Sequence, residues 1–313
     1  HIISNRVYFR IHGDLIEEFQ ISTVEHEKII NILVDERKIS NDMDFSYSFK
    51  GLCRTRVNIA KQRDSYSATL RIVNVEVPKR ETLGIPKILD DIMHKNKGLF
   101  IVTGPTGSGK STTLASMIDY INSVSNKKIV TLEDPIEYLH ENKKSVIMQR
   151  EIGEDTTFKR GLTACLRQDP DIILVGEMRD EETVKTALRA AETGHLVLTT
   201  LHTIGTANTL TRIIDQFPDN KREQICIQLS NSLIGVFSQN LIKSVKGHRV
   251  VAYEVMIMDK GLRNIIKENK VHTIEQYMQT SRNCVLLEKS LEQLKREGLI
   301  NNKQIEDLLI DYR

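Results

Sequence analysis

The segment Gly104–Ser111 constrains the fold of this chain more than any other part of the sequence. It reads Gly-Pro-Thr-Gly-Ser-Gly-Lys-Ser and fits the phosphate-binding pattern G-x-x-x-x-G-K-[ST]. The apolar run 99–103 before it predicts a buried strand, and residues 112–120 after it predict a helix with apolar residues on one face. Because this is the context that the pattern requires, we expect a phosphate-binding loop rather than a chance glycine-rich turn.

The residue types in this loop suit an anion. Glycines let backbone N–H groups surround a phosphate without clashes from Cβ atoms, and the helix N-terminus adds a partial positive charge. We expect Lys110 to face solvent and reach the β- and γ-phosphates, and the Ser111 hydroxyl to bind Mg²⁺. The predicted phosphate-binding residues are Gly104, Pro105, Thr106, Gly107, Ser108, Gly109, Lys110, Ser111 and Thr112.

Length and composition indicate a soluble globular protein of two domains, with 313 residues, 40% hydrophobic and 27% charged. The net charge of +2 does not point to nucleic acid. The four cysteines are scattered without a C-x-x-C pair, which argues against a zinc module. No apolar run approaches the ~20 residues of a membrane-spanning helix, and no signal peptide is evident. Since a strand-like pattern begins directly after His1, we expect a trimmed N-terminus.

Residues 1–80 predict a small α+β domain. The patterning indicates a hairpin around Gly13-Asp14, a helix over 23–37 capped by Thr23, and strands near 43–49, 53–62 and 67–75. Residues 81–97 predict a linker with a short helix, since prolines interrupt regular structure there.

From residue 98 to 258 predicted strands alternate with predicted helices. The strands are apolar and rich in β-branched residues, which predicts a mainly parallel sheet covered on both faces, that is, an α/β fold. Residues 259–313 predict a helical tail. The expected strands are 99–103, 129–133, 172–176, 196–201 and 249–256, and the expected helices include 158–168, 181–193, 207–216 and 222–237.

Two predicted strands end in acidic residues. The run Ile172–Gly176 is followed by Glu177, at the strand end where ligands bind in open α/β sheets. A carboxylate there can hold Mg²⁺ or orient the attacking water, although a solvent-facing acid is the alternative. Glu133, Asp134 and Glu137 follow the strand 129–133, and three carboxylates so close together favour a metal–phosphate site over a solvated turn.

His195 and His202 flank the predicted strand 196–201. Their odd spacing places them on opposite faces if the strand is regular, so they need not share a ligand. Metal binding by this pair alone is not expected, because suitably spaced carboxylate or cysteine partners are missing.

Residues 50–80 carry eight basic residues against two acidic ones. Arg54, Arg56 and Asn58 alternate on one face of a predicted strand. A solvated face and a nucleic-acid patch are two interpretations, and few aromatic residues interleave to support the second. In a third interpretation, these arginines contact a phosphate at a subunit interface.

Four motifs together resemble the secretion ATPases of type II secretion and type IV pilus systems. They occur in family order as the loop Gly104–Ser111, an aspartate box at Thr131–Tyr138, a Walker B motif at Leu174–Asp180 and a histidine box at Ala190–His202. Within the family the chain most resembles the pilus retraction ATPases of twitching motility. It has no tetracysteine module, and Gly261–Glu268 (GLRNIIKE) is close to the retraction motif A-I-R-N-L-I-R-E.

The resemblance implies a PAS-like N-terminal domain, a RecA-like ATPase domain and a ring of six subunits. It implies that Lys110 and Ser111 bind phosphate and Mg²⁺, and that Glu177 is the catalytic and metal-associated carboxylate. It also implies roles for other residues: Glu137, Glu133 and Asp134 in placing water and metal, and His195 and His202 in sensing the γ-phosphate and shaping the interface. Arg56 and Arg71, with Arg54 or Arg63 as a further candidate, would contact the nucleotide.

The resulting hypothesis is a cytoplasmic, Mg²⁺-dependent ATPase that retracts type IV pilus fibres and docks on an inner-membrane platform protein, with ATP and Mg²⁺ as cofactors and no nucleic-acid partner. The alternatives are a pilus assembly or type II secretion ATPase, a RecA-like nucleic-acid motor, and a nucleotide-binding regulator that does not hydrolyse. The acidic residues argue against the last of these.

Overall fold

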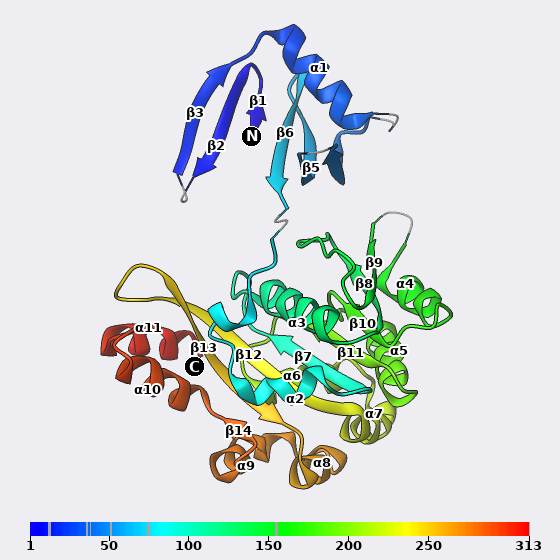
Figure 1. Cartoon of the computed structure of the whole chain (residues 1–313), viewed down its shortest axis with the longest axis vertical. Coiled ribbons are helices and arrows are strands. Elements are labelled where there is room, and N and C mark those ends of the chain that lie inside the picture. Colours follow the sequence, from blue (N-terminus) through cyan, green and yellow to red (C-terminus); the bar gives the residue numbers. More distant parts are fainter. Residues whose placement is uncertain are drawn as a thin grey trace. The chain divides into compact units, whose positions relative to one another are not determined.

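The computed structural model describes residues 1–11, 14–35, 37, 39–50, 52–73, 76–153 and 156–312 (Figure 1). The predicted turn at Gly13, the strand end predicted at Val75 and the final residue Arg313 lie outside this part of the chain. The chain divides into two compact units, one formed mainly by His1–Glu76 and the other by Val77–Ile136 with His140–Arg313.

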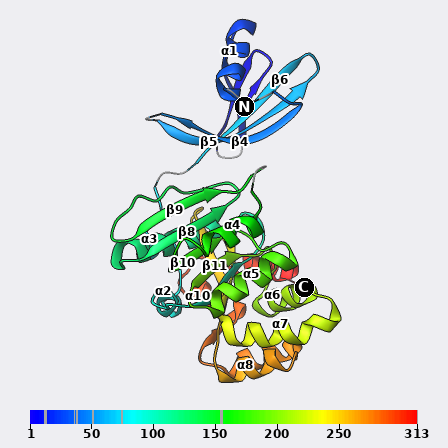
Figure 2. The same cartoon turned by 90° about the vertical axis from the view of Figure 1, so that its right-hand side faces the viewer.

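The first unit is a six-stranded sheet with one helix against it (Figure 2). Ile30 and Leu33 of the helix pack on Val57 and Ile59 of the sheet. The strand order is β3-β2-β1-β6-β5-β4. The elements are β1 (Ile2–Ile3), β2 (Arg6–Ile11), β3 (Asp14–Gln20), α1 (Thr23–Val34), β4 (Asp42–Phe49), β5 (Cys53–Gln62) and β6 (Ser65–Ile72).

Helix α1 begins at the predicted residue, but the capping residue differs. The Ser22 side chain accepts a hydrogen bond from the backbone N–H of Glu25, and the Glu25 carboxylate accepts one from the backbone N–H of Ser22. This is a capping box, so Ser22 rather than Thr23 satisfies the free donors of the first turn. The helix ends at Val34, before the predicted Arg37.

The second unit contains an eight-stranded sheet in the order β14-β13-β12-β7-β11-β10-β8-β9. The strands from β12 to β9 pair in parallel, and β12, β13 and β14 pair antiparallel. The mainly parallel sheet of the sequence analysis is therefore present. Its strands are β7 (Gly98–Thr103), β8 (Lys128–Glu133), β9 (Val146–Glu151), β10 (Ile172–Val175), β11 (Leu196–Thr200), β12 (Leu233–Lys243), β13 (Arg249–Ile257) and β14 (Cys284–Val285).

Helices cover both faces of this sheet. Along β7, Leu99 and Ile101 face a core that includes α4 to α8, while Phe100 and Val102 face a core that includes α2 and α3. Because both faces are buried, every residue of β7 is buried, which explains its continuous apolar run. The helices of these layers are α2 (Asp90–Met93), α3 (Lys110–Val124), α4 (Phe158–Cys165), α5 (Glu181–Glu192), α6 (Thr206–Asp215), α7 (Asp219–Ser232) and α8 (Lys260–Lys267).

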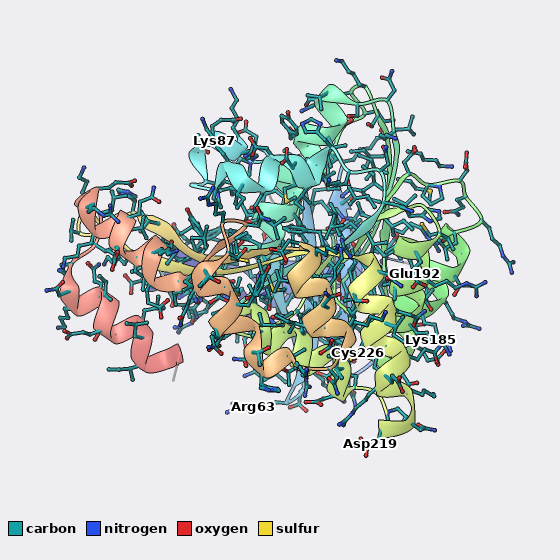
Figure 3. The ribbon with its side chains drawn as sticks, turned by 90° about the horizontal axis from the view of Figure 1, so that it is seen from below. Arg63, Lys87, Lys185, Glu192, Asp219 and Cys226 are labelled. Carbon is teal, nitrogen blue, oxygen red and sulfur yellow. The ribbon has the colours of Figure 1, made fainter. Side chains whose placement is uncertain are left out.

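Helices α5 and α7 lie side by side on one face (Figure 3). Lys221 Nζ of α7 lies 2.8 Å from Glu181 Oε1 of α5, and Gln228 Nε2 donates to Glu192 Oε2 over 3.1 Å. The Cys226 thiol of α7 is buried, and burial raises its pKa.

The helix predicted over 222–237 is partly wrong, because α7 ends at Ser232 and β12 begins at Leu233. A short apolar run such as the one after Ser232 is compatible with either a helix or a strand. Its pairing with β7 makes it a strand. Strand β9 was not predicted either, and it carries polar residues at the sheet edge.

The C-terminal part is mostly helical, as predicted. It contains η3 (Val271–Thr273), α9 (Ile274–Thr280), α10 (Leu287–Arg296) and α11 (Asn302–Tyr312), and Leu287 and Leu291 pack with Ile242 of β12. The segment before β7 contains the short helices η1 (Arg80–Thr82) and η2 (Lys87–Leu89). In the part of the chain that the structure describes, no helix has the length and apolar character that crossing a membrane demands.

Candidate active site

The phosphate-binding loop connects β7 to α3, as predicted. Gly104, Gly107 and Gly109 have φ angles of 138°, 80° and 89°, which L-residues with side chains rarely adopt. A Cβ atom on Gly104 would lie 2.2 Å from the carbonyl oxygen of Gln239, so this position also requires glycine for space. Helix α3 begins at Lys110 without a side-chain cap.

Lys110 is buried rather than solvent-facing, with an exposed fraction of 7%. Its Nζ donates to the carbonyl oxygens of Gly104 over 2.8 Å and Pro105 over 3.0 Å. The expectation of a solvent-facing lysine was wrong because the loop wraps around the side chain and offers its carbonyls as acceptors.

The carboxyl ends of four parallel strands bring the candidate residues together. Strands β7, β11, β10 and β8 are neighbours in the sheet, with Val175 of β10 level with Leu132 of β8 and Thr199 of β11. The next residues along these strands therefore share one edge, which carries the loop, His202, Glu177 and Glu133.

Glu177, His202 and Lys110 form a connected group at this edge. His202 Nε2 lies 3.5 Å from Glu177 Oε2, and His202 Nδ1 lies 3.3 Å from Lys110 Nζ. An ammonium group can only donate, so Nδ1 accepts from Lys110 and the ring proton resides on Nε2, facing Glu177. Arg179 Nε also lies 2.7 Å from Glu177 Oε2, whose side chain is only 17% exposed.

The three acids of the aspartate box lie in different surroundings. Glu133 Oε1 accepts hydrogen bonds from Thr131 Oγ1 over 2.6 Å and from Gln149 Nε2 over 3.3 Å. Asp134 and Glu137 are exposed. Hydrogen bonds to its carboxylate therefore hold Glu133 at the strand end.

The structure does not bring His195 together with His202. His195 precedes β11, and its Nδ1 lies 3.0 Å from the carbonyl oxygen of Ala190. The five residues of β11 separate the two histidines, and a strand rises roughly 3.3 Å per residue. The structure therefore does not support a role for His195 beside the same phosphate as Lys110 of the same chain.

Three of the predicted arginines lie on strands of the first unit, and Arg63 lies in the turn between β5 and β6. Arg56 of β5 stands directly opposite Arg71 of β6. Arg56 pairs with Asp44 through Nε to Oδ1 at 2.9 Å and Nη2 to Oδ2 at 2.5 Å. Arg54 lies on the same face and donates to Ser48 Oγ over 3.4 Å. Arg63 has a φ angle of 54° and is exposed.

Residues that the sequence analysis missed also support the site. The Thr103 hydroxyl donates to the carbonyl oxygen of Thr203 over 2.6 Å and lies 2.9 Å from the Thr203 hydroxyl, which fixes the chain next to His202. Gln239 contacts the loop from β12. No local motif marks either residue, because their partners are about a hundred or more positions away.

The residues present fit a nucleotide with Mg²⁺. The Ser108 hydroxyl is buried inside the loop without a hydrogen-bond partner, and no side chain caps the start of α3, a helix end that favours anions. Ser111 stands next to Lys110 at this helix start. Among the described residues, no group of three or more His, Cys, Asp or Glu could hold a metal by itself, so Mg²⁺ would need phosphate oxygens as ligands.

A parallel α/β sheet with this loop between β7 and α3 defines the class of P-loop proteins. Residues 6–249 match the family described as "Type II/IV secretion system protein". The chain belongs to this family.

Similar proteins agree with this assignment. The chain is 43% identical over 303 residues to "Twitching motility protein" of Neisseria gonorrhoeae, covering 93% of this chain and 81% of that protein. It is 42% identical over 305 residues to "Type IV pilus retractation ATPase PilT" of Pseudomonas aeruginosa, covering 94% and 88%. The crystal structure of "the Pilus Retraction Motor PilT and Bound ADP" has a TM-score of 0.89 at 44% identity, covering 96% of this chain and 89% of that chain.

Proposed function

We propose that this chain is a Mg²⁺-dependent ATPase motor that drives retraction of type IV pili. The proposal depends on the connected group Lys110–His202–Glu177, which lies beside a loop that matches the complete P-loop motif. His202 lies 3.3 Å from Lys110 and 3.5 Å from Glu177. The similarity to pilus retraction ATPases supports retraction as the task.

The side chains at the sheet edge would divide the work. Lys110 would exchange the carbonyls of Gly104 and Pro105 for phosphate oxygens, which have a stronger negative charge. Glu177 would accept a proton from the attacking water or orient it, while Arg179 holds its carboxylate. Ser111 and Glu177 would hold Mg²⁺, which when bound neutralises charge on the phosphates.

His202 would connect the two groups. When Lys110 moves to a phosphate, the imidazole loses a neighbour on Nδ1, and its Nε2–H still faces Glu177. Glu133, Asp134 and Glu137 would assist in placing water and metal, and His195 would act at an interface between subunits.

The same similarity supports a proposal for the larger assembly. We infer a PAS-like module over residues 1–80, a linker over 81–97, a RecA-like domain over 98–258 and a helical tail over 259–313. Six subunits would form a ring in the cytoplasm that docks on an inner-membrane platform protein, without nucleic acid as a partner. The relative's bound ADP supports nucleotide as the ligand.

Substitution of Lys110 tests the ATPase activity. Lys110→Ala removes the cation from the loop, so phosphate release should fall by about 10²-fold or more. Lys185→Ala, an exposed lysine on α5, is the matched control and should keep wild-type turnover. Wild-type phosphate release from a folded Lys110→Ala protein would show that the loop is not the catalytic phosphate site.

Deletion of the gene tests the direction of the motor. Loss of a retraction motor should leave cells with pili that cannot move by twitching, whereas loss of an assembly motor should leave cells without pili. A secretion defect in piliated, motile cells would favour a type II secretion ATPase, which the family also includes.

A further inference from the structure

Gln239 reaches the phosphate-binding loop from the strand behind it. This side chain belongs to β12 and is only 1% exposed. Its Nε2 donates to the carbonyl oxygen of Ser108 over 2.5 Å, and its Oε1 accepts from the Thr113 hydroxyl over 2.8 Å. The amide therefore joins the loop to the first turn of α3.

The register of the sheet places Gln239 at this position. Ser238 of β12 is level with Thr103, the last residue of β7, so Gln239 is level with the first glycine of the loop. Its backbone is so close that a Cβ on Gly104 would lie 2.2 Å from its carbonyl oxygen. A Cβ on Gly109 would lie 3.2 Å from its Nε2. The strand thus lies directly against both ends of the loop, at Gly104 and at Gly109.

The hydrogen bond to Ser108 controls the direction of a neighbouring donor. The carbonyl of Ser108 and the N–H of Gly109 belong to one planar peptide group, in which they point in opposite directions. Because Gln239 holds the carbonyl on the β12 side, the Gly109 N–H points away from β12, into the loop. Backbone N–H groups directed inward are what such a loop offers to a phosphate.

We propose that Gln239 is a positioning residue that orients the Ser108–Gly109 peptide for phosphate binding. This inference rests on the proposed nucleotide-binding function. Gln239 does not contact the reacting atoms, and it acts through the peptide group that it holds. An amide suits the position because it offers one donor to Ser108 and one acceptor to Thr113.

The test compares ADP affinity in three variants of the full chain. Gln239→Met keeps the size of the side chain but loses both hydrogen bonds, so the dissociation constant for Mg²⁺-ADP should rise about tenfold. Gln239→Glu keeps an acceptor for Thr113 but loses the donor to Ser108, so it should lose about as much affinity. Thr113→Val removes only the link to α3 and should lose less, about threefold.

Calorimetric titration with ADP, well below the melting temperature, provides the measurement. Gln216→Met is the matched control, since the Gln216 amide oxygen has no hydrogen-bond partner and the residue belongs to the end of α6. It should bind ADP like the wild type. A purely structural role of Gln239 would lower the melting temperature without changing the affinity of the folded protein.

The outcomes separate this inference from the function on which it rests. If folded Gln239→Met and Gln239→Glu proteins bind ADP within twofold of the wild type, the positioning role is refuted while the ATPase proposal stands. If neither variant folds, Thr113→Val decides, and unchanged affinity there also overturns the inference. If the wild-type chain itself does not bind ADP, the proposed function fails instead.

Discussion

We propose that Glu177 acts on the water that attacks the bound nucleotide. Arg179 and His202 both approach its Oε2, at 2.7 Å and 3.5 Å, so the side chain is oriented before any ligand arrives. Glu177→Gln keeps the shape and removes the charge that accepts a proton. We expect ATP binding to persist while turnover falls by about 10²-fold or more.

Nucleotide affinity and phosphate release measured on one Glu177→Gln sample check this prediction. Glu223→Gln changes an exposed carboxylate of α7 and should leave both quantities unchanged. Unchanged turnover in Glu177→Gln would assign this carboxylate a structural role.

Glu254 predicts a pH dependence of stability. Burial raises the pKa of this carboxyl above its ordinary value of 4.5, nearby Glu275 and Glu288 raise it further, and hydrogen bonds from Thr206 only partly oppose the shift. Thr206 donates from its N–H and its hydroxyl, each over 2.6 Å, at the start of α6. In the window above pH 4.5, the folded state therefore keeps a proton that the unfolded state releases.

The sign of this effect is opposite to that of a salt-bridged acid. The folded state binds more protons in that window, so stability should fall as pH rises through it, and Glu254→Gln should remove this contribution. Thermal unfolding of both proteins between about pH 4.5 and pH 7 measures the difference. The wild type should gain stability relative to the variant as the pH is lowered, and parallel pH profiles would contradict the prediction.

At the scale of elements, α8 shows why the retraction-like motif departs from its pattern. Glycine stands at position 261, where the motif A-I-R-N-L-I-R-E begins with alanine. A Cβ on Gly261 would lie 2.3 Å from the Tyr277 hydroxyl oxygen of α9 and 2.7 Å from a ring carbon. The Tyr277 hydroxyl donates to Asp259, whose carboxylate caps α8 at Leu262. The ring thus occupies the space of the missing methyl group.

Gly261→Ala should therefore destabilise the protein although alanine favours helices. We expect a net loss of about 1 kcal/mol, since overpacking costs ~2 kcal/mol in the middle of its range and helix propensity returns ~1 kcal/mol. Denaturant titration measures the loss. In a Tyr277→Ala background the same substitution should stabilise, and Asn264→Ala, exposed on the same helix, should be neutral or slightly stabilising. An equal cost in both backgrounds would contradict the steric explanation.

At the scale of the whole molecule, we propose that the first unit supplies arginine to the nucleotide. Arg56 and Arg71 are directly opposite each other, and like charges in such a pair repel unless an anion offsets them. Asp44 offsets part of this charge through Arg56.

Arg56→Ala and Arg71→Ala should each retain fold and ring assembly yet lose most turnover, by ~10³-fold if they act as arginine fingers. Phosphate release and analytical ultracentrifugation measure the two properties. Lys61→Ala changes an exposed lysine of the same strand and should leave turnover unchanged. Full activity in both arginine variants would show that this face is only a charged surface.

Elements that are marked by a pattern within a short segment could be predicted from the sequence. The loop Gly104–Ser111 follows its strand and precedes its helix as predicted, and β5 has the predicted bounds Cys53–Gln62. The predicted acidic strand ends at Glu133 and Glu177 share one edge, because parallel strands place their carboxyl ends together. The loop and the bounds of β5 depend on residue spacing within one short segment, and the shared edge depends on the parallel sheet that alternating strands and helices predict.

Features that depend on contacts between residues far apart in the chain became visible only in the three-dimensional structure. It brought His202, but not His195, to Lys110, and it placed residues 233–237, where a helix was predicted, in strand β12 beside β7. It also buried Lys110 and placed Gln239 behind the loop. The physical reason is that these outcomes depend on which strands become neighbours and in what register, and no spacing within a short segment encodes a contact across 131 positions.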